Sequence, residues 1–222
     1  MTQSADAGVK GTVDIVEPTK AEQAIARRAA ETRATVPDLE LAVEVDMDAC
    51  MRLGGVSTTA ALVKASALAL QQHPRANAAY RDGHYELYSR VNVGLVIARG
   101  HELVTATVFD ADRKSVDELT DEVQDLKRRS RELTPPERSG ATFTLADPGA
   151  YGMSRATPLV SSPQAAALAA GEVRQAAVVR DGSIVPGHVM TLVLASDHRI
   201  FYGADAAQFL ARIRQLLERA DL

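Results

Sequence analysis

Residues 192–217 read LVLASDHRIFYGADAAQFLARIRQLL and pass from a strand pattern through a polar cluster to a helix pattern. The apolar run over residues 190–195 predicts a buried strand, and apolar residues three and four apart after Gly203 predict an amphipathic helix. His198 lies in the polar cluster between them. An imidazole at the end of a rigid strand, with an unperturbed pKa near ~6.5, can remove a proton at neutral pH. His198 is therefore a candidate general base, with a hydrogen-bonded structural histidine as the alternative.

Several segments resemble the blocks of one family and follow one another in that family's order. They are LVKASALALQQHPRANAAY (residues 62–80), VNVGLVIARGHELVTATVFDADRKSVDEL (91–119), ATFTLADPGAYGM (141–153), PLVSSPQAAALAAGEV (158–173) and SDHRIFYGADAAQFL (196–210). The family is the 2-oxoacid dehydrogenase acyltransferase, or dihydrolipoyl acyltransferase, catalytic domain, which belongs to the chloramphenicol acetyltransferase-like superfamily. The resemblance implies an α/β fold, an α+β sandwich in which a mixed β-sheet carries helices packed on one side.

The length of the chain and its N-terminal composition set the domain prediction. A chain of 222 residues can bury one sizeable core. The small and polar residues 1–12 predict a disordered lead-in. The resemblance places a single acyltransferase-like catalytic domain over residues 13–222, of the stand-alone kind, since the lipoyl-bearing module of the family is not expected in so short a lead-in.

The resemblance also implies the site residues. In the family, a histidine base followed by three residues and Asp-Gly works with a serine that donates to the oxyanion, at the interface between subunits of a trimer. Here His198 and Gly203 fit, but Tyr202 occupies the aspartate position and Ala146 the serine position. Thr144, two residues earlier on the same strand face and some ~6–7 Å away, is an imperfect substitute donor. We predict that His198, Tyr202 and Thr144 are the catalytic residues.

The composition argues against several other classes of function. A net charge of −4 and the short basic run over residues 127–129 argue against nucleic acid as a partner. Cys50 is the single cysteine, and no histidine has a metal-ligand spacing with other ligand residues, so no metal site is expected. The sequence contains neither a signal-peptide pattern nor an apolar run of ~20 residues. We therefore expect a cytoplasmic protein with no membrane contact.

The remaining hydrophobic patterns predict the other elements. An all-round apolar helix is expected over residues 57–72, with Lys64 pointing outward along it, and a capping box at Ser115 opens a second helix. A first helix is expected over residues 19–32. Predicted strands cover residues 39–46, 84–88, 91–98, 103–109, 141–145, 175–179 and 189–196.

Three functions remain open from the sequence. The favoured one is an acyltransferase, in particular an O-acetyltransferase, that moves an acetyl group from acetyl-CoA or a carrier-bound thioester to a hydroxyl of a small-molecule acceptor in antibiotic biosynthesis. The others are the core of a 2-oxoacid dehydrogenase complex acting with a separate lipoyl domain, and a non-catalytic trimeric scaffold. Each is expected to be a homotrimer without a tightly bound cofactor, and an acyl-carrier or lipoyl-carrier protein is a candidate partner. The fold alone does not distinguish them.

Overall fold

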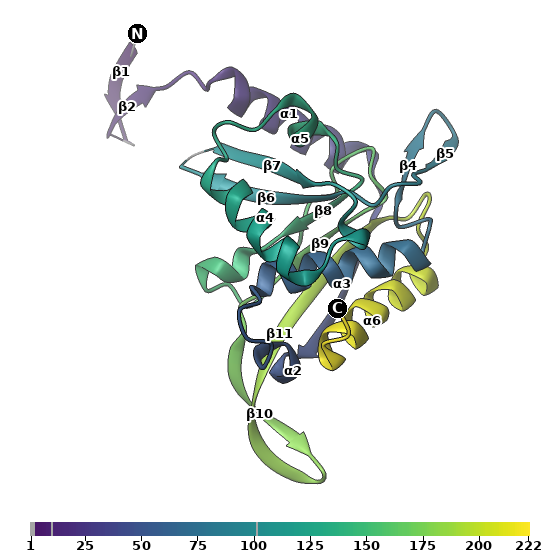
Figure 1. The fold of residues 1–222 in the computed structure, drawn as a ribbon. Coiled ribbons are helices and arrows are strands. Elements are labelled where there is room, and N and C mark those ends of the chain that lie inside the picture. The colour runs from purple at the N-terminus through teal and green to yellow at the C-terminus, as the bar shows by residue number, and fades with distance from the viewer. Residues whose placement is uncertain (1–2, 10, 101) are drawn as a thin grey trace.

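A seven-stranded mixed sheet forms the centre of the molecule (Figure 1). The computed structural model describes residues 3–9, 11–100 and 102–222. The strand order is β10-β11-β9-β8-β6-β7, with β3 also paired to β11. Strand β8 runs parallel to β6 and β9, and the other neighbours are antiparallel. The strands are β3 (Asp38–Asp46), β6 (Val93–Arg99), β7 (Glu102–Val108), β8 (Phe143–Ala146), β9 (Ala166–Ala170), β10 (Arg174–Arg180) and β11 (Ser183–Asp197).

Strand β11 organises this sheet because it pairs with three others. Its first half pairs with β10 and forms the hairpin that projects from the body in Figure 1. Its second half runs between β3 and β9, with Asp197 opposite Asp38 and Ser196 opposite Ala166. The side chain of Leu192 is fully buried, as the apolar run in the sequence predicts. Pairing with β3 and β9 therefore holds the end of β11 in place, directly before His198.

Helices cover one face of the sheet, as predicted. Helix α3 (Thr58–Gln72) packs against α4 (Val116–Arg128) and α6 (Gly203–Arg219), and these three helices lie over the same face in Figure 1. Phe209 of α6 meets Phe143 of β8 edge-on, with ring centroids 5.8 Å apart. The remaining helices are α1 (Lys20–Thr35), α2 (Asp48–Met51), α5 (Pro135–Ser139) and the 3₁₀ turns η1 (Ala111–Arg113) and η2 (Pro148–Tyr151).

A disordered lead-in is expected over residues 1–12, of which residues 1, 2 and 10 lie outside the described part of the chain, and the rest takes part in a hairpin. Strand β1 (Gln3–Gly8) pairs antiparallel with β2 (Gly11–Ile15), and this hairpin stands apart from the sheet in Figure 1. All five side chains of β2 are exposed, so the order comes from backbone pairing rather than from a hydrophobic core. The polar composition did not indicate this pairing.

Lys64 corrects another expectation. It does not point outward along α3, because its side chain is buried and its Nζ donates to the carbonyls of Asp112 and Lys114 at 2.9 and 2.6 Å. Burial lowers the pKa of Lys64. The two carbonyls lie around the short η1 turn, so the ammonium joins α3 to the segment that leads into α4.

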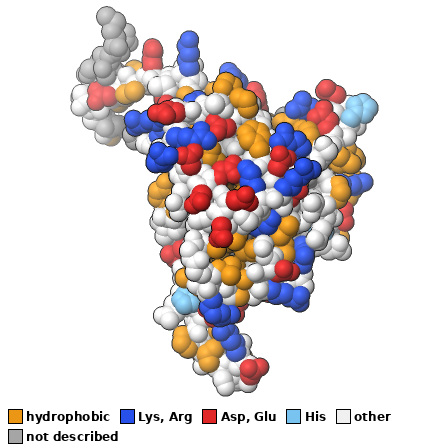
Figure 2. Space-filling model, in the orientation of Figure 1, with side chains coloured by type: hydrophobic (Ala, Val, Ile, Leu, Met, Phe, Trp, Pro, Cys, Tyr) orange, Lys and Arg blue, Asp and Glu red, His pale blue; other side chains and the backbone are white. Residues whose placement is uncertain are grey.

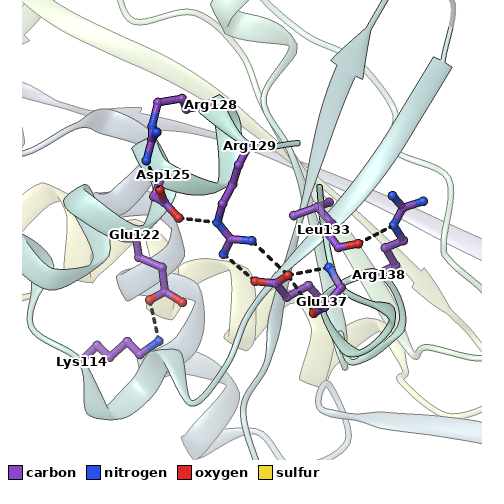
Figure 3. A network of polar contacts seen from close by, with 9 residues as sticks. Lys114, Glu122, Asp125, Arg128, Arg129, Leu133, Glu137 and Arg138 are labelled. Atoms are coloured by element: carbon purple, nitrogen blue, oxygen red, sulfur yellow. Dashed lines mark hydrogen bonds and ion pairs between the residues drawn. The ribbon is translucent and has the colours of Figure 1, made fainter. Parts of the chain in front are cut away.

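An ion-pair network joins α4 to α5 (Figure 3). The Arg129 guanidinium bonds Asp125 of α4 on one side and Glu137 of α5 on the other, at 2.5 and 3.1 Å to the two Glu137 oxygens. Glu137 also accepts from the backbone N–H of Thr134 at 2.8 Å, which completes a capping box. These bonds lower the pKa of Glu137 to about 2, with the Arg129 bond as the largest cause. The network fixes α5 against the C-terminal end of α4.

The surface shows mixed charge. Figure 2 shows basic and acidic side chains interspersed over the face that it displays. Across the described residues, no helix combines the length and the apolar character needed to span a bilayer.

Candidate active site

The backbone around His198 is held on both sides. The backbone N–H of His198 donates to the Pro37 carbonyl at 3.0 Å, and the N–H of Phe201 donates to the Asp197 carbonyl at 2.9 Å. Ile200 and Phe201 are fully buried, so they anchor the turn that leads into α6. The His198 side chain itself is exposed, and its ring makes no hydrogen bond within the described part of the chain. An imidazole in this state is open to a substrate, as a general base requires.

Asp197, directly before His198, is bonded to Arg199 rather than to the histidine. Its carboxylate is 1% exposed and accepts from Arg199 Nε at 2.9 Å and from the terminal nitrogen at 2.6 Å. The carboxylate raises the pKa of Arg199. The Arg199 guanidinium lies 4.5 Å from the centre of the Tyr80 ring, a cation–π distance. The pair therefore neutralises a buried charge and stiffens the turn that carries His198.

Tyr202, which the resemblance singles out as a site residue, lies beside His198. The two ring centroids are 5.8 Å apart with an interplanar angle of 58°. The Tyr202 hydroxyl oxygen is 3.1 Å from that of Tyr85, whose hydroxyl is also 3.1 Å from the Arg199 carbonyl. The hydrogen bond with Tyr202, with smaller effects of burial and neighbouring phenols, raises the pKa of Tyr85, so Tyr85 is neutral at pH 7.

Tyr85 and Arg75 lie beside Tyr202 but are not among the predicted site residues. The Arg75 guanidinium lies 5.5 Å from the centre of the Tyr85 ring and 5.4 Å from that of Tyr202. Tyr85 is on β5 (His84–Leu87), which pairs with β4 (Ala78–Arg81) in a separate hairpin. More than a hundred residues separate this hairpin from Tyr202, and no local pattern in the sequence signals such a contact.

The structure does not bring Thr144 to His198 within one chain. Thr144 and Ala195 both pair with Ala167 of β9, so they are two strand spacings apart, roughly 10 Å, and His198 lies beyond the end of β11. The Thr144 hydroxyl is 3% exposed and donates to Gln164 Oε1 at 2.7 Å. Its proton is thus already engaged. Ala146, farther along the same strand, has no donor to offer.

A polar cavity opens beside Thr144. It has a volume of about 550 Å³, and its walls include Arg28, Arg81, Arg90 and Arg138. Arg90 is neutralised by Asp110 at 2.5 Å, and Arg138 donates to the Leu133 carbonyl at 3.0 Å. Thr144 lies in the wall of this cavity, although the residue is 3% exposed.

The other candidate reactive residues have structural partners. His188 Nδ1 is 2.7 Å from Asp48 Oδ1 at the base of the β10–β11 hairpin. The Cys50 thiol lies 3.1 Å from the Leu217 carbonyl, and burial raises its pKa, which disfavours the reactive thiolate. In the described ranges, no three His, Cys, Asp or Glu side chains are grouped to hold a metal ion.

The sequence profile of the 2-oxoacid dehydrogenases acyltransferase (catalytic domain) matches residues 10–222. The chain belongs to this family. It is 30% identical over 211 residues to the dihydrolipoyllysine-residue acetyltransferase component of the pyruvate dehydrogenase complex of Rickettsia typhi, covering 88% of this chain and 52% of that protein. The chain thus spans about half the length of this relative.

Solved structures confirm the predicted fold class. Azotobacter vinelandii dihydrolipoamide acetyltransferase superposes with a TM-score of 0.88 at 25% identity, covering 97% of this chain and 96% of that one. Chloramphenicol acetyltransferase superposes with a TM-score of 0.58 at 16% identity, covering 98% and 100%, which supports the shared fold alone.

The Azotobacter protein was studied for the roles of a serine, a histidine and an asparagine in its catalytic mechanism. Those three positions are separated by the same intervals as Ala146, His198 and Tyr202 in this family member. The histidine is thus retained here, while alanine stands at the serine position and tyrosine at the asparagine position.

Proposed function

We propose that this family member is an acyltransferase that exchanges an acetyl group between a lipoyl-type thioester and coenzyme A, with His198 as general base. The observation that carries this proposal is the unbonded, exposed His198 ring on a rigid turn at the end of β11. Family membership over residues 10–222 supports it. Lipoyl thioester and coenzyme A then act as substrates, and no cofactor stays bound between turnovers.

The reaction needs a base and a donor. His198 would take the proton of the acceptor thiol, whose sulfur attacks the thioester carbonyl. The tetrahedral oxyanion then collapses and expels the donor sulfur as a thiolate, which receives the proton back from His198. Thr144 could donate to the oxyanion only after giving up its bond to Gln164. Since Thr144 and His198 are far apart in one chain, we propose a homotrimer in which neighbouring subunits complete each site. A separate lipoyl-carrier protein would supply the acyl group.

A hydroxyl acceptor is the second candidate. Ala146 and Tyr202 replace two of the three residues studied in the Azotobacter relative, which favours a changed acceptor. The Rickettsia relative belongs to the pyruvate dehydrogenase complex, which favours the thiol acceptor over the small alcohol of antibiotic biosynthesis that the sequence favoured.

The decisive experiment measures acetyl transfer from S-acetyl-dihydrolipoamide to coenzyme A, beside a panel of small alcohols. We expect His198→Ala to lower kcat by about 10²–10⁴-fold, because loss of the general base removes a factor of this size. His84→Ala, which removes an exposed histidine on β5, is the matched control and should keep the wild-type rate.

Two outcomes would contradict the proposal. If His198→Ala retains most of the wild-type rate, His198 is not the base. If the wild-type protein transfers acetyl to neither coenzyme A nor an alcohol and binds no acyl-CoA in calorimetry, the scaffold alternative replaces the enzyme. Transfer to an alcohol alone would support the second candidate.

A further inference from the structure

The contacts of Tyr202 fix the direction of its hydrogen bond. The Arg199 carbonyl oxygen can only accept, so the 3.1 Å contact with Tyr85 Oη requires the Tyr85 proton. A neutral phenol has one proton. The 3.1 Å contact between the two phenols must then use the proton of Tyr202, which makes Tyr202 the donor and Tyr85 the acceptor. This is the arrangement that satisfies both contacts with the two protons available.

Tyr202 consequently faces the site with its oxygen lone pairs alone. Arg75 lies over the faces of the Tyr85 and Tyr202 rings, so it contacts the rings rather than the hydroxyl groups. The Tyr202 side chain is 40% exposed and beside the His198 ring. A substrate that reaches His198 therefore meets a hydrogen-bond acceptor next to the base.

Tyr85 is held in place, so it can fix the direction of the hydrogen bond from Tyr202. Its strand β5 pairs with β4, and β4 is fixed to the body by the Tyr80 N–H, which donates to the Pro163 carbonyl at 3.2 Å, and by a bridge between Ala79 and Gln164. The Tyr80 ring lies 6.0 Å from the Tyr85 ring and stacks with Arg199. The hairpin and the His198 turn are thus one connected unit.

We propose that Tyr85 is a positioning residue that locks Tyr202 as a hydrogen-bond acceptor, and that Tyr202 thereby selects substrate arms carrying an amide N–H a few bonds from the reacting sulfur. The inference rests on the proposed acyl transfer. The reacting thiol gives its own proton to His198, so the group that donates to Tyr202 must be a second donor on the same arm. An ester in place of the amide offers a carbonyl oxygen, which cannot donate to Tyr202.

The closeness of the two rings calls for an arm of only a few bonds. The reacting sulfur must contact His198 while the N–H contacts Tyr202 Oη, and the ring centroids are 5.8 Å apart. A chain of two or three carbons between sulfur and nitrogen, at ~1.5 Å per bond, spans such a gap. The N-methylamide of β-mercaptopropionic acid has this form, and its methyl ester is the matched arm without the N–H.

The experiment compares these two thiols as acetyl acceptors. With the wild-type protein we expect the KM of the amide to be about 3–10-fold below that of the ester, since one neutral hydrogen bond changes affinity by about this factor. Tyr202→Phe should bring the ratio to about one by raising the amide KM, with a smaller change in kcat, the pattern of lost uniform binding.

Tyr85→Phe tests directly whether Tyr85 makes Tyr202 a hydrogen-bond acceptor. Tyr202 keeps its hydroxyl but regains a free proton, so it can donate to the ester carbonyl as well as accept from the amide. We expect the ratio to approach one because the ester KM falls, in contrast to the rise of the amide KM in Tyr202→Phe. Tyr88→Phe, which removes a phenol whose bond is to Glu86 at 3.4 Å, is the matched control and should leave the ratio unchanged.

The outcomes separate this inference from the proposed function. If transfer depends on His198 but both tyrosine variants retain the wild-type ratio, the inference is overturned while the proposed function stands. If the wild-type protein shows equal KM values for the amide and the ester, Tyr202 does not select an amide N–H, and the inference is overturned. A loss of all transfer in the wild-type protein overturns both.

Discussion

Ala146 stands at the position of the serine that was studied in the Azotobacter relative. It lies on β8 in the neighbourhood of Thr144, whose proton is donated to Gln164. A serine at this position would add a hydroxyl donor for the oxyanion. We expect Ala146→Ser to raise kcat for the thiol acceptor by up to about 10²–10³-fold, the usual loss when one oxyanion donor is removed.

The control for this gain is Ala146→Cys, which adds a side chain of similar size but a weak donor. Transfer rates measured at saturating coenzyme A should rise for the serine variant alone. Equal rates for Ala146→Ser and the wild-type protein would show that a backbone N–H already serves the oxyanion.

The local residue pattern placed His198 at the end of a strand, and the family resemblance singled out Tyr202, but neither indicated the partners of Tyr202. His198 and Tyr202 belong to one continuous stretch whose strand, turn and helix are visible from hydrophobic spacing. Tyr85 and Arg75 come to the site through long-range packing of the β4–β5 hairpin. Thr144 has the right chemistry in the sequence, but only the structure shows that its hydroxyl is engaged.

The α4–α5 junction makes stability depend on pH. The folded pKa of Glu137 is about 2, well below the ~4.3 of an unfolded glutamate. A lowered folded pKa adds stability above the unfolded value, and this stability is lost as the pH falls toward about 2. We expect Glu137→Gln to lower the Tm at pH 7 by about 2–4 °C, the effect of ~1 kcal/mol in a chain of this size.

Thermal unfolding from pH 7 down to pH 2 measures this effect. The difference in Tm between Glu137→Gln and the wild-type protein should shrink below about pH 4.3, where Glu137 of the unfolded chain takes up a proton while the folded carboxylate stays ionised, and should vanish toward pH 2. Glu132→Gln removes an exposed carboxylate two residues before the α5 capping box and should show no comparable difference. A difference that stays constant with pH would mean that packing, and not charge, explains it.

The hydrophobic periodicity of the sequence predicted some of the helices and strands but not others. Helices α3 and α6 and the second half of strand β11 lie where their apolar spacing predicts them, and α4 begins at the predicted capping box. Strand β9 reads AALAA, and a run of alanines has no strand period and a stronger helix propensity, so it was not predicted. Lys64 was misplaced because a lysine normally reaches solvent, whereas here two backbone carbonyls satisfy its charge.

The arrangement of the whole chain indicates that one subunit does not complete the site. The β8 face that carries Ala146 and Thr144 and the turn that carries His198 are separated by two strand spacings and the end of β11. A base and an oxyanion donor must both lie within about 3 Å of the same reacting group. A second copy that presents its β8 face to His198 resolves this separation, as in the homotrimer proposed above.

Assembly and activity should therefore fall together on dilution. At micromolar concentration we expect a mass three times the 23.7 kDa of the chain in light scattering. As the trimer dissociates at lower concentration, the activity per chain should fall in step with the mass, because each dissociated His198 loses the neighbour's β8 face. Ser183→Ala, at the exposed tip of the β10–β11 hairpin, is a suitable unperturbed reference variant. A stable monomer with full activity per chain would show that one subunit holds the entire site.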